Sequence, residues 1–194
     1  MTKGAKRAIR RELLQRRAGV GAGEGATEAL TARLLALDVL AQAERVAAYW
    51  PFGTEPSPVG AIEALAARGA TVLLPVGLAD GDLDWAPYAG PDGLTPGRWR
   101  FAEPGSAPLG PDSIATVDAV IAPALAVDGS GGRLGRGSGA YDRALARVRP
   151  GVPIIAIVYD EEVLDEVPME AHDRRVTHVV TPRRTVVVPG AHLS

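Results

Sequence analysis

The chain has 194 residues, of which 46% are apolar, and this suits one globular domain with a substantial buried core. Its formal net charge of −2 argues against a general nucleic-acid-binding protein, which would normally carry a basic excess. The absence of cysteine excludes disulfides, zinc–thiolate sites, iron–sulfur clusters and cysteine nucleophiles, and it is consistent with a reducing cytosol.

The N-terminal segment is strongly basic, and residues 2–18 are predicted to form a helix with one apolar stripe among its basic faces. No apolar run typical of a secretory signal follows it, and no segment approaches the roughly 18 apolar residues of a membrane span. We expect a cytoplasmic monomer without membrane or nucleic-acid partners. A glycine-rich break over 19–25 precedes a second predicted helix over 26–37, extending to about residue 42.

The chain then alternates between apolar runs typical of buried strands and amphipathic stretches typical of helices. A strand is predicted over 45–51, a helix over 58–69 and a second strand over 70–75. Alternating apolar residues over 83–88 indicate a short antiparallel strand. The long segment 76–116 is rich in proline and glycine and carries tryptophan and tyrosine, so we interpret it as a functional insertion.

The second half of the chain repeats this alternation. Its predicted elements are a strand over 117–125, a glycine-rich loop over 128–140, a helix over 140–149, and strands over 153–159, 176–182 and 185–189. Continuous apolar strands that alternate with helices indicate a mostly parallel sheet covered on both faces. We therefore predict an α/β fold, a single three-layer domain over 1–194 in which helices flank a sheet of about five to seven strands.

The loop over 128–140 is the first candidate site, because ligands of open α/β sheets lie beyond the carboxyl ends of the strands. Three alternating glycines over 135–139 let backbone N–H groups approach an anion, and Arg133 and Arg136 add positive charge. The spacing matches neither the Walker A motif nor the dinucleotide-binding fingerprint. Two interpretations stay open, a phosphate-binding loop and a flexible connection between a strand and a helix.

Asp142 lies at the predicted start of the helix that follows this loop. A carboxylate in a first helical turn stabilises the helix dipole, and this is a common structural role. The same carboxylate beside a bound phosphate would suit Mg²⁺, which binds carboxylate and phosphate oxygens together with water. The sequence alone leaves both roles open.

The residues around this loop resemble a known family. "APALAVDGSGGRLGRGSGAYDRAL", residues 122–145, is similar to the signature of the 5-formyltetrahydrofolate cyclo-ligases, also called 5,10-methenyltetrahydrofolate synthetases. Four further blocks resemble that family in the same order along the chain, at 6–17, 49–58, 98–104 and 167–182. Five ordered blocks are much more specific than a glycine count. The family's fold is a three-layer α/β arrangement, shared with sugar-phosphate isomerases and CoA transferases.

The resemblance implies an enzyme that converts 5-formyltetrahydrofolate and ATP, with Mg²⁺, into 5,10-methenyltetrahydrofolate, ADP and phosphate. It implies catalytic roles for Arg133, Arg136 and Tyr141, and metal ligation by Asp142 and Asp173. The implied folate site consists of Trp50, Glu55 and Trp99. The implied ATP-binding residues are Lys6, Arg7, Ala8, Ile9, Arg10, Arg133, Leu134, Gly135, Arg136, Gly137, Ser138, Gly139, Ala140 and Tyr141.

Considered without the resemblance, the charged candidates have plainer explanations. Lys6 and Arg10 are four residues apart and share a helix face, which is typical of a solvated basic surface. Asp173 is followed by Arg174 and Arg175, so a local ion pair would account for it. Glu55 would be a loop carboxylate between prolines.

The aromatic candidates differ from one another. Trp50 follows a predicted strand, where packing into the core is the usual role. Trp99 lies in a segment rich in proline and glycine, where it is a candidate for stacking against a flat ring, and the sequence alone leaves this role and a structural one equally open.

Three positions depart from residues found in the family: Ala140 stands where many members have Tyr, Ser138 where one common variant has Lys, and Glu162 where many relatives have Gln. Two alternative functions stay open: another enzyme on the same fold, and a non-catalytic protein that binds folate or nucleotide.

Overall fold

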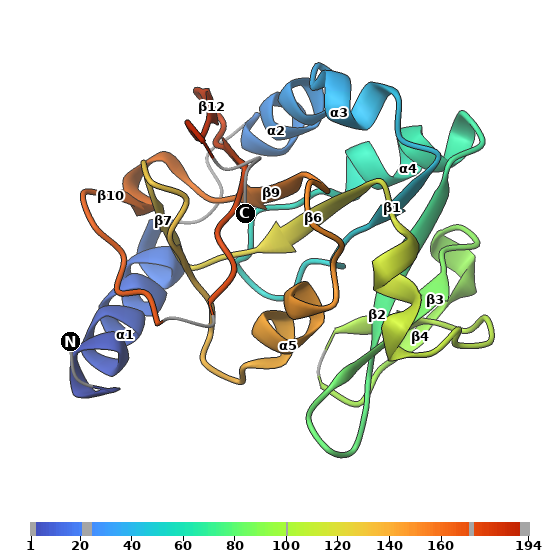
Figure 1. Ribbon diagram of the computed structural model, residues 1–194, viewed down its shortest axis with the longest axis horizontal. Helices are drawn as coiled ribbons and strands as arrows, with labels where there is room; N and C mark the ends of the chain where they lie inside the picture. Colours follow the sequence, from blue (N-terminus) through green and yellow to red (C-terminus); the bar gives the residue numbers. More distant parts are fainter. Residues whose placement is uncertain (1–2, 21–24, 100, 171–172, 191–194) are drawn as a thin grey trace.

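A computed structural model describes residues 3–20, 25–99, 101–170 and 173–190 (Figure 1). Its centre is a seven-stranded sheet in the order β12-β11-β9-β6-β1-β2-β3, in which β11, β9, β6, β1 and β2 run parallel and the two edge strands run antiparallel. The strands are β1 (Arg45–Ala47), β2 (Thr71–Gly77), β3 (Leu83–Pro87), β6 (Ala119–Pro123), β9 (Ile154–Ile157), β11 (His178–Val180) and β12 (Thr185–Val187). The predicted mostly parallel sheet is confirmed.

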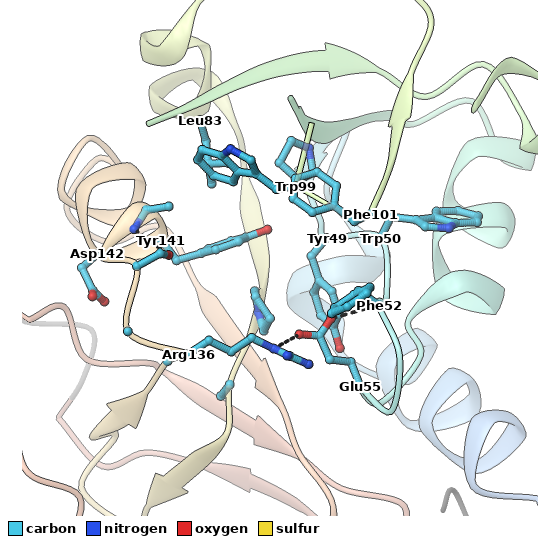
Figure 2. A pocket seen from close by; sticks show the side chains of 18 of the residues that line it. Tyr49, Trp50, Phe52, Glu55, Leu83, Trp99, Phe101, Arg136, Tyr141 and Asp142 are labelled. Atoms are coloured by element: carbon cyan, nitrogen blue, oxygen red, sulfur yellow. Dashed lines mark hydrogen bonds and ion pairs between the residues drawn. The ribbon is translucent and has the colours of Figure 1, made fainter. Parts of the chain in front are cut away.

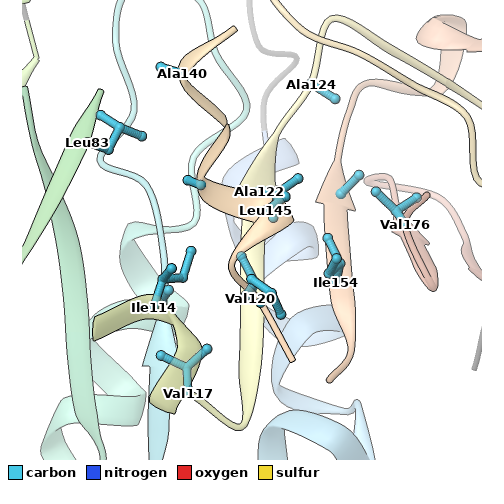
Figure 3. Close-up of a cluster of buried hydrophobic side chains, with 14 of the residues drawn as sticks. Leu83, Ile114, Val117, Val120, Ala122, Ala124, Ala140, Leu145, Ile154 and Val176 are labelled. Atoms are coloured by element: carbon cyan, nitrogen blue, oxygen red, sulfur yellow. The ribbon is translucent and has the colours of Figure 1, made fainter. Parts of the chain in front are cut away.

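Helices cover both faces of this sheet. One face packs against α2 (Ala26–Leu35), α3 (Asp38–Ala41) and α4 (Val59–Ala67), and the other packs against α5 (Ala140–Ala146) and a 3₁₀ helix, η2 (Pro111–Thr116). The two faces follow from side-chain alternation along each strand. In β6, Val120 and Ala122 join the core beneath α5 and η2 (Figure 3), whereas Ala119 and Ile121 join the core beneath α2 and α4. The predicted flanking of the sheet by helices is confirmed.

The first helix packs outside these layers, on a smaller sheet. This sheet has the order β10-β7-β8, and its strands are β10 (Val163–Leu164), β7 (Ala126–Asp128) and β8 (Arg133–Leu134). Helix α1 (Lys3–Val20) is amphipathic, and its buried Leu13 packs with Leu125, Leu134 and Val167. The helix therefore lies beside the segment that leads into the glycine-rich loop (Figure 1).

The insertion between β2 and β6 forms ordered structure. It contains β3, which pairs with β2 in the predicted antiparallel direction, and a hairpin of β4 (Leu94–Pro96) and β5 (Ala102–Pro104). Two short 3₁₀ helices complete the described elements, η1 (Pro91–Gly93) and η3 (Asp160–Glu162). Within the described part of the chain, every helix is too short or too polar to cross a membrane.

Several of the predicted strands and helices were too long. Strand β1 ends at Ala47, although Ala48 and Tyr49 beyond it are still buried. The second helix ends at Leu35, and a separate short helix follows at Asp38. An apolar run indicates buried residues, and residues can stay buried after the strand or helix has ended. The predicted break over 19–25 begins later than expected, since α1 continues to Val20, and 21–24 lie outside the described residues.

Candidate active site

A cavity of about 340 Å³ lies at the carboxyl ends of β1 and β6. Aromatic and apolar side chains line one part of it, and the glycine-rich loop lines another (Figure 2). The lining residues are Tyr49, Trp50, Phe52, Glu55, Pro75, Leu83, Trp99, Phe101, Pro123, Ala124, Arg133, Gly135, Arg136, Gly137, Ser138, Gly139, Ala140, Tyr141 and Asp142. The loop that sequence analysis singled out therefore shares one cavity with the three predicted folate residues.

The glycines of the loop are required by its backbone and by a close neighbour. Gly137 and Gly139 have φ angles of 102° and 73°, a left-handed conformation that glycine adopts at little cost. A Cβ added at Gly137 would lie 3.2 Å from the guanidinium carbon of Arg10. Arg10 Nε also donates a hydrogen bond to the carbonyl oxygen of Gly135 at 2.9 Å. The first helix and the glycine-rich loop are thus in direct contact.

Arg133 is buried beneath the loop, with only 3% of its side chain exposed. Its guanidinium donates to the Asp142 carboxylate and, at 3.1 Å, to the carbonyl oxygen of Pro123. Burial lowers the pKa of Arg133, and the negative charge of Asp142 opposes that shift. Arg133 therefore holds Asp142 in place at the cavity. In this arrangement the positive charge of Arg133 is paired with the Asp142 carboxylate.

Arg136 has a different environment, at the rim of the cavity. Its Nε lies 2.8 Å from Glu55 Oε1, and its guanidinium lies 5.2 Å from the centre of the Phe52 ring. The other Glu55 oxygen accepts the Phe52 backbone N–H at 3.0 Å. Arg136 thus joins the glycine-rich loop to the loop after β1 (Figure 2).

The basic face of α1 makes specific long-range contacts in addition to facing solvent. Lys6 Nζ lies 3.1 Å from Glu170 Oε1 and 3.3 Å from Asp173 Oδ2. Asp173 therefore pairs with a lysine far away in the sequence. Of the two expected local partners, Arg174 donates to the carbonyl oxygens of residues 148 and 149, and Arg175 donates to Ser130. Arg7 and Ala8 are exposed on the same helix, and Ile9 packs against the cluster around Leu13.

The two predicted tryptophans are used differently. Trp99 is half-buried, makes an edge-to-face contact with Phe101 at 6.3 Å, and lies over Gly77, where an added Cβ would come within 2.9 Å of the indole. Trp50 stacks on Tyr88 with ring centres 5.8 Å apart, so much of its ring area is committed to packing. Trp99 and Phe101 both present aromatic surface to the cavity.

Tyr141 projects its ring into the cavity (Figure 2). The ring meets Trp85 edge-on at 6.3 Å, and the phenol oxygen is buried without a hydrogen-bond partner among the described residues. Burial raises the pKa of Tyr141 well above its ordinary value, and the charge of Glu55 acts in the same direction. The hydroxyl therefore stays protonated and is free to donate a hydrogen bond to a ligand.

The two predicted metal ligands lie in different places. Asp142 lines the cavity with 34% of its side chain exposed, whereas Asp173 is paired with Lys6 and is not among the described lining residues. No cluster of three or more metal-binding side chains exists within the described ranges. This donor set fits a Mg²⁺ ion that takes most of its oxygen ligands from phosphates and water, and one or two from protein.

Some of the lining residues were not predicted from the sequence. Phe52 and Phe101 are close in sequence to the predicted Glu55 and Trp99, within the same two quoted blocks. An aromatic residue beside a predicted ligand-binding residue in a short loop was the available signal. The buried ion pair between Arg17 and Glu162 left no signal, because the two residues are 145 positions apart.

Comparisons with known proteins identify the family of this chain. The model of the 5-formyltetrahydrofolate cyclo-ligase family matches residues 2–182. The 5-formyltetrahydrofolate cyclo-ligase of Mycolicibacterium smegmatis is 40% identical over 194 residues, which cover 96% of this chain and 98% of that protein. Among solved structures, a 5,10-methenyltetrahydrofolate synthetase from Aquifex aeolicus superposes with a TM-score of 0.79 at 24% identity, covering 95% of this chain and 93% of that one.

A second synthetase structure, from Mycoplasma pneumoniae, gives a TM-score of 0.72 at 19% identity and covers 91% of this chain and 98% of that one. At such identities the two structures support the fold, and the family model and the 40% identical relative support the family. The chain belongs to the 5-formyltetrahydrofolate cyclo-ligase family.

Proposed function

We propose that this chain catalyses the ATP- and Mg²⁺-dependent cyclisation of 5-formyltetrahydrofolate to 5,10-methenyltetrahydrofolate, with release of ADP and phosphate. The observation that carries the proposal is the composition of one cavity. Arg136 of the glycine-rich loop and Asp142 at the start of α5 bring charged groups to it, and Trp99, Phe101 and Tyr141 bring aromatic surface. A phosphate donor and a flat pterin need these two kinds of surface side by side.

The reaction has to activate an amide-like formyl group, which is a poor electrophile. The formyl oxygen on N5 attacks the γ-phosphorus of ATP, ADP leaves, and an iminium phosphate forms. N10 then adds to the activated carbon and loses its proton. Expulsion of phosphate completes the methenyl bridge. The protein's tasks are to align the two substrates and to neutralise charge on the transferring phosphoryl group.

The phosphate-facing tasks fall to the loop and the first helix. Arg136, at the rim, is the arginine of the loop best placed to reach phosphate oxygens, because Arg133 is committed to Asp142 beneath it. Lys6 and Arg10 add positive charge from α1, and Lys6 would exchange its carboxylate partners for phosphate.

The folate-facing tasks fall to aromatic side chains of the cavity and to Glu55. Trp99 and Phe101 would stack on the pterin, and the Glu55 carboxylate would accept pterin N–H groups. The unpartnered Tyr141 hydroxyl would donate a hydrogen bond at the junction of the two ligands. Trp50 would shape the site through its stacking on Tyr88.

Asp142 would hold Mg²⁺ at the cavity, with Asp173 as a second ligand only after it parts from Lys6. When bound, the ion would supply positive charge to neutralise phosphate oxygens. Arg133 would keep the Asp142 carboxylate oriented toward that position. We also propose that the protein acts as a cytoplasmic monomer on these small-molecule substrates.

An absorbance assay tests the proposal. Purified protein with 5-formyltetrahydrofolate, ATP and Mg²⁺ should produce a growing near-ultraviolet absorbance of the methenyl product, and omission of ATP should abolish it. Asp142→Ala should lose most of the turnover at low Mg²⁺, since Asp142 is the proposed ligand at the cavity. A folded protein that binds nucleotide but forms no product would refute the cyclo-ligase function and favour the non-catalytic alternative.

A further inference from the structure

One ion pair joins the two halves of the cavity that are proposed to bind different substrates. Arg136 belongs to the loop proposed to contact ATP, and Glu55 belongs to the loop proposed to contact the pterin. Their side chains meet with Arg136 Nε 2.8 Å from Glu55 Oε1 (Figure 2). Each group is therefore the partner of the other in this arrangement.

The loop after β1 is shaped to hold this arginine. Glu55 has only 10% of its side chain exposed, and its second oxygen accepts the backbone N–H of Phe52. The Phe52 ring offers its face to the same guanidinium at 5.2 Å. Arg136 is 37% exposed, so a ligand reaches it more easily than it reaches the carboxylate.

When a phosphate opens this pair, Arg136 gains a new partner but Glu55 is left without its ion-pair partner. Glu55 is then a buried carboxylate beside aromatic rings. A pterin that donates N–H groups to Glu55 would satisfy that carboxylate. In the other order, the pterin releases Arg136 for phosphate. The first substrate to bind bears the cost of opening the pair, and the second does not.

We infer that the Arg136–Glu55 pair couples the binding of the two substrates, so that each raises the protein's affinity for the other. The inference rests on the proposed function. Coupling between two sites is reciprocal, because the same free energy appears in both binding equilibria. Typical couplings change affinity by about 5- to 150-fold. For this single pair at a partly exposed rim we expect a change on the order of 10-fold.

The coupling is measured by isothermal titration calorimetry with the full chain. The probes are 5-formyltetrahydrofolate and a non-hydrolysable ATP analogue with Mg²⁺, each titrated alone and with the other at saturation. The wild-type protein should bind each probe on the order of 10-fold more tightly when the other is present. Equal affinities with and without the second probe would overturn the inference.

Substitution of the pair provides a result that loss of structure would not mimic. Arg136→Gln removes the charge and frees Glu55, so it should bind 5-formyltetrahydrofolate alone several-fold more tightly than the wild type, with the coupling factor near one. Glu55→Gln should likewise tighten binding of the ATP analogue alone. The inference would be contradicted if Arg136→Gln bound 5-formyltetrahydrofolate more weakly than the wild type and Glu55→Gln bound the ATP analogue more weakly.

Arg11→Gln is the matched control, since Arg11 is an exposed arginine of α1 outside the cavity, and this variant should keep the wild-type coupling. If Arg136→Gln fails to fold by circular dichroism, Glu55→Gln makes the same test from the other side. The absorbance assay on the wild type separates the two proposals. Product formation together with independent binding refutes only the coupling, whereas no product from folded protein refutes the proposed function.

Discussion

The two ends of helix α1 hold their cations in opposite ways. Near the C-terminal end, Arg17 is 2% exposed and pairs with Glu162, which is 6% exposed, through two of its nitrogens. Near the N-terminal end, Lys6 is 12% exposed and pairs with Glu170 and Asp173, of which Glu170 is 47% exposed. One pair is sealed in protein, and the other is open to water on one side.

The different exposure of these ion pairs indicates what each end of α1 is suited to do. Arg17 cannot leave Glu162 without stranding a charge in a medium of low dielectric, and it also donates to the carbonyl oxygen of Ala124 at 2.6 Å. Ala124 lines the cavity, so the buried end fixes α1 to the wall of the site. Lys6 can exchange its exposed partner Glu170 for another anion at small cost, because a pair with one well-exposed member contributes little net free energy. The helix is anchored at one end and available for phosphate at the other.

The sharpest way to break this comparison is to remove the buried cation. Arg17→Leu would leave the Glu162 carboxylate buried without its partner, and we expect the free energy of unfolding to fall by about 3–5 kcal/mol. Urea denaturation followed by circular dichroism measures this loss. The double variant Arg17→Leu/Glu162→Leu removes both charges and should recover part of it. A loss below about 1 kcal/mol in the single variant would mean that the pair is accessible to water in solution.

The buried pair also shows where prediction from sequence ends. The helix itself was predictable, because an apolar stripe among basic residues indicates an amphipathic helix that rests on a core. Arg17 looked like any other basic residue of that pattern, since its partner lies 145 positions away and its burial depends on the docked helix. Glu162 stands where many relatives carry Gln by family resemblance, and the structure gives its charge a partner.

The central sheet was predictable for a related reason. Apolar runs of strands such as β6 and β9 are buried on both faces, so burial alone identifies them. The two-residue strand β8 lies inside the predicted loop, because two residues beside glycines show no periodicity. Its pairing with β7 is a tertiary contact, and it is what places Arg133 in the protein interior.

The candidate site was predictable only through ordered family blocks. Spacing alone left the loop open between a phosphate site and a connector, and one cavity now contains the loop, Glu55 and Trp99. The ion pairs made by Arg136 and by Lys6 could not be predicted, because each joins segments that are far apart in sequence. Pairing of this kind is decided by how the layers pack.

The next largest effect should come from the apolar contact of Leu13, which lies between the two ends of α1. Leu13 is 4% exposed and packs with Leu125, Leu134 and Val167 on the small sheet. Leu13→Ala should lower the free energy of unfolding by about 2–3 kcal/mol, the lower part of the usual range, because this small cluster can partly close around the gap. The same urea titration measures it. A larger loss than that of Arg17→Leu would make apolar packing, and not the ion pair, the main anchor of the helix.

At the open end, substitution should change substrate binding more than stability. Lys6→Met keeps the aliphatic stem and removes the charge, so we expect the KM for ATP to rise on the order of 10-fold, about 1.4 kcal/mol, with a much smaller change in the KM for the folate. Initial rates of methenyl formation at varied ATP measure this. The free energy of unfolding should fall by about 1 kcal/mol, because Glu170 is well exposed and Asp173, although 11% exposed, still accepts the Glu170 backbone N–H at 2.7 Å. Equal changes in both KM values would show that Lys6 maintains the cavity as a whole.

The smallest effect should come from Arg16, the neighbour of Arg17 in sequence and its opposite in environment. Arg16 is 62% exposed and pairs along the helix with Glu12, which is 61% exposed, at 2.6 Å. Because water solvates both charges, Arg16→Ala should cost only about 0.3–0.5 kcal/mol, and added salt should reduce that cost. Urea denaturation at low and high ionic strength measures it, and the KM for ATP should not change. If substitution of Arg17 lowers the free energy of unfolding about ten times as much as substitution of Arg16, burial of the ion pair is the source of the stabilisation. If the two losses are similar, the overall charge of the helix is the source, and the contrast between its two ends no longer explains how α1 is held.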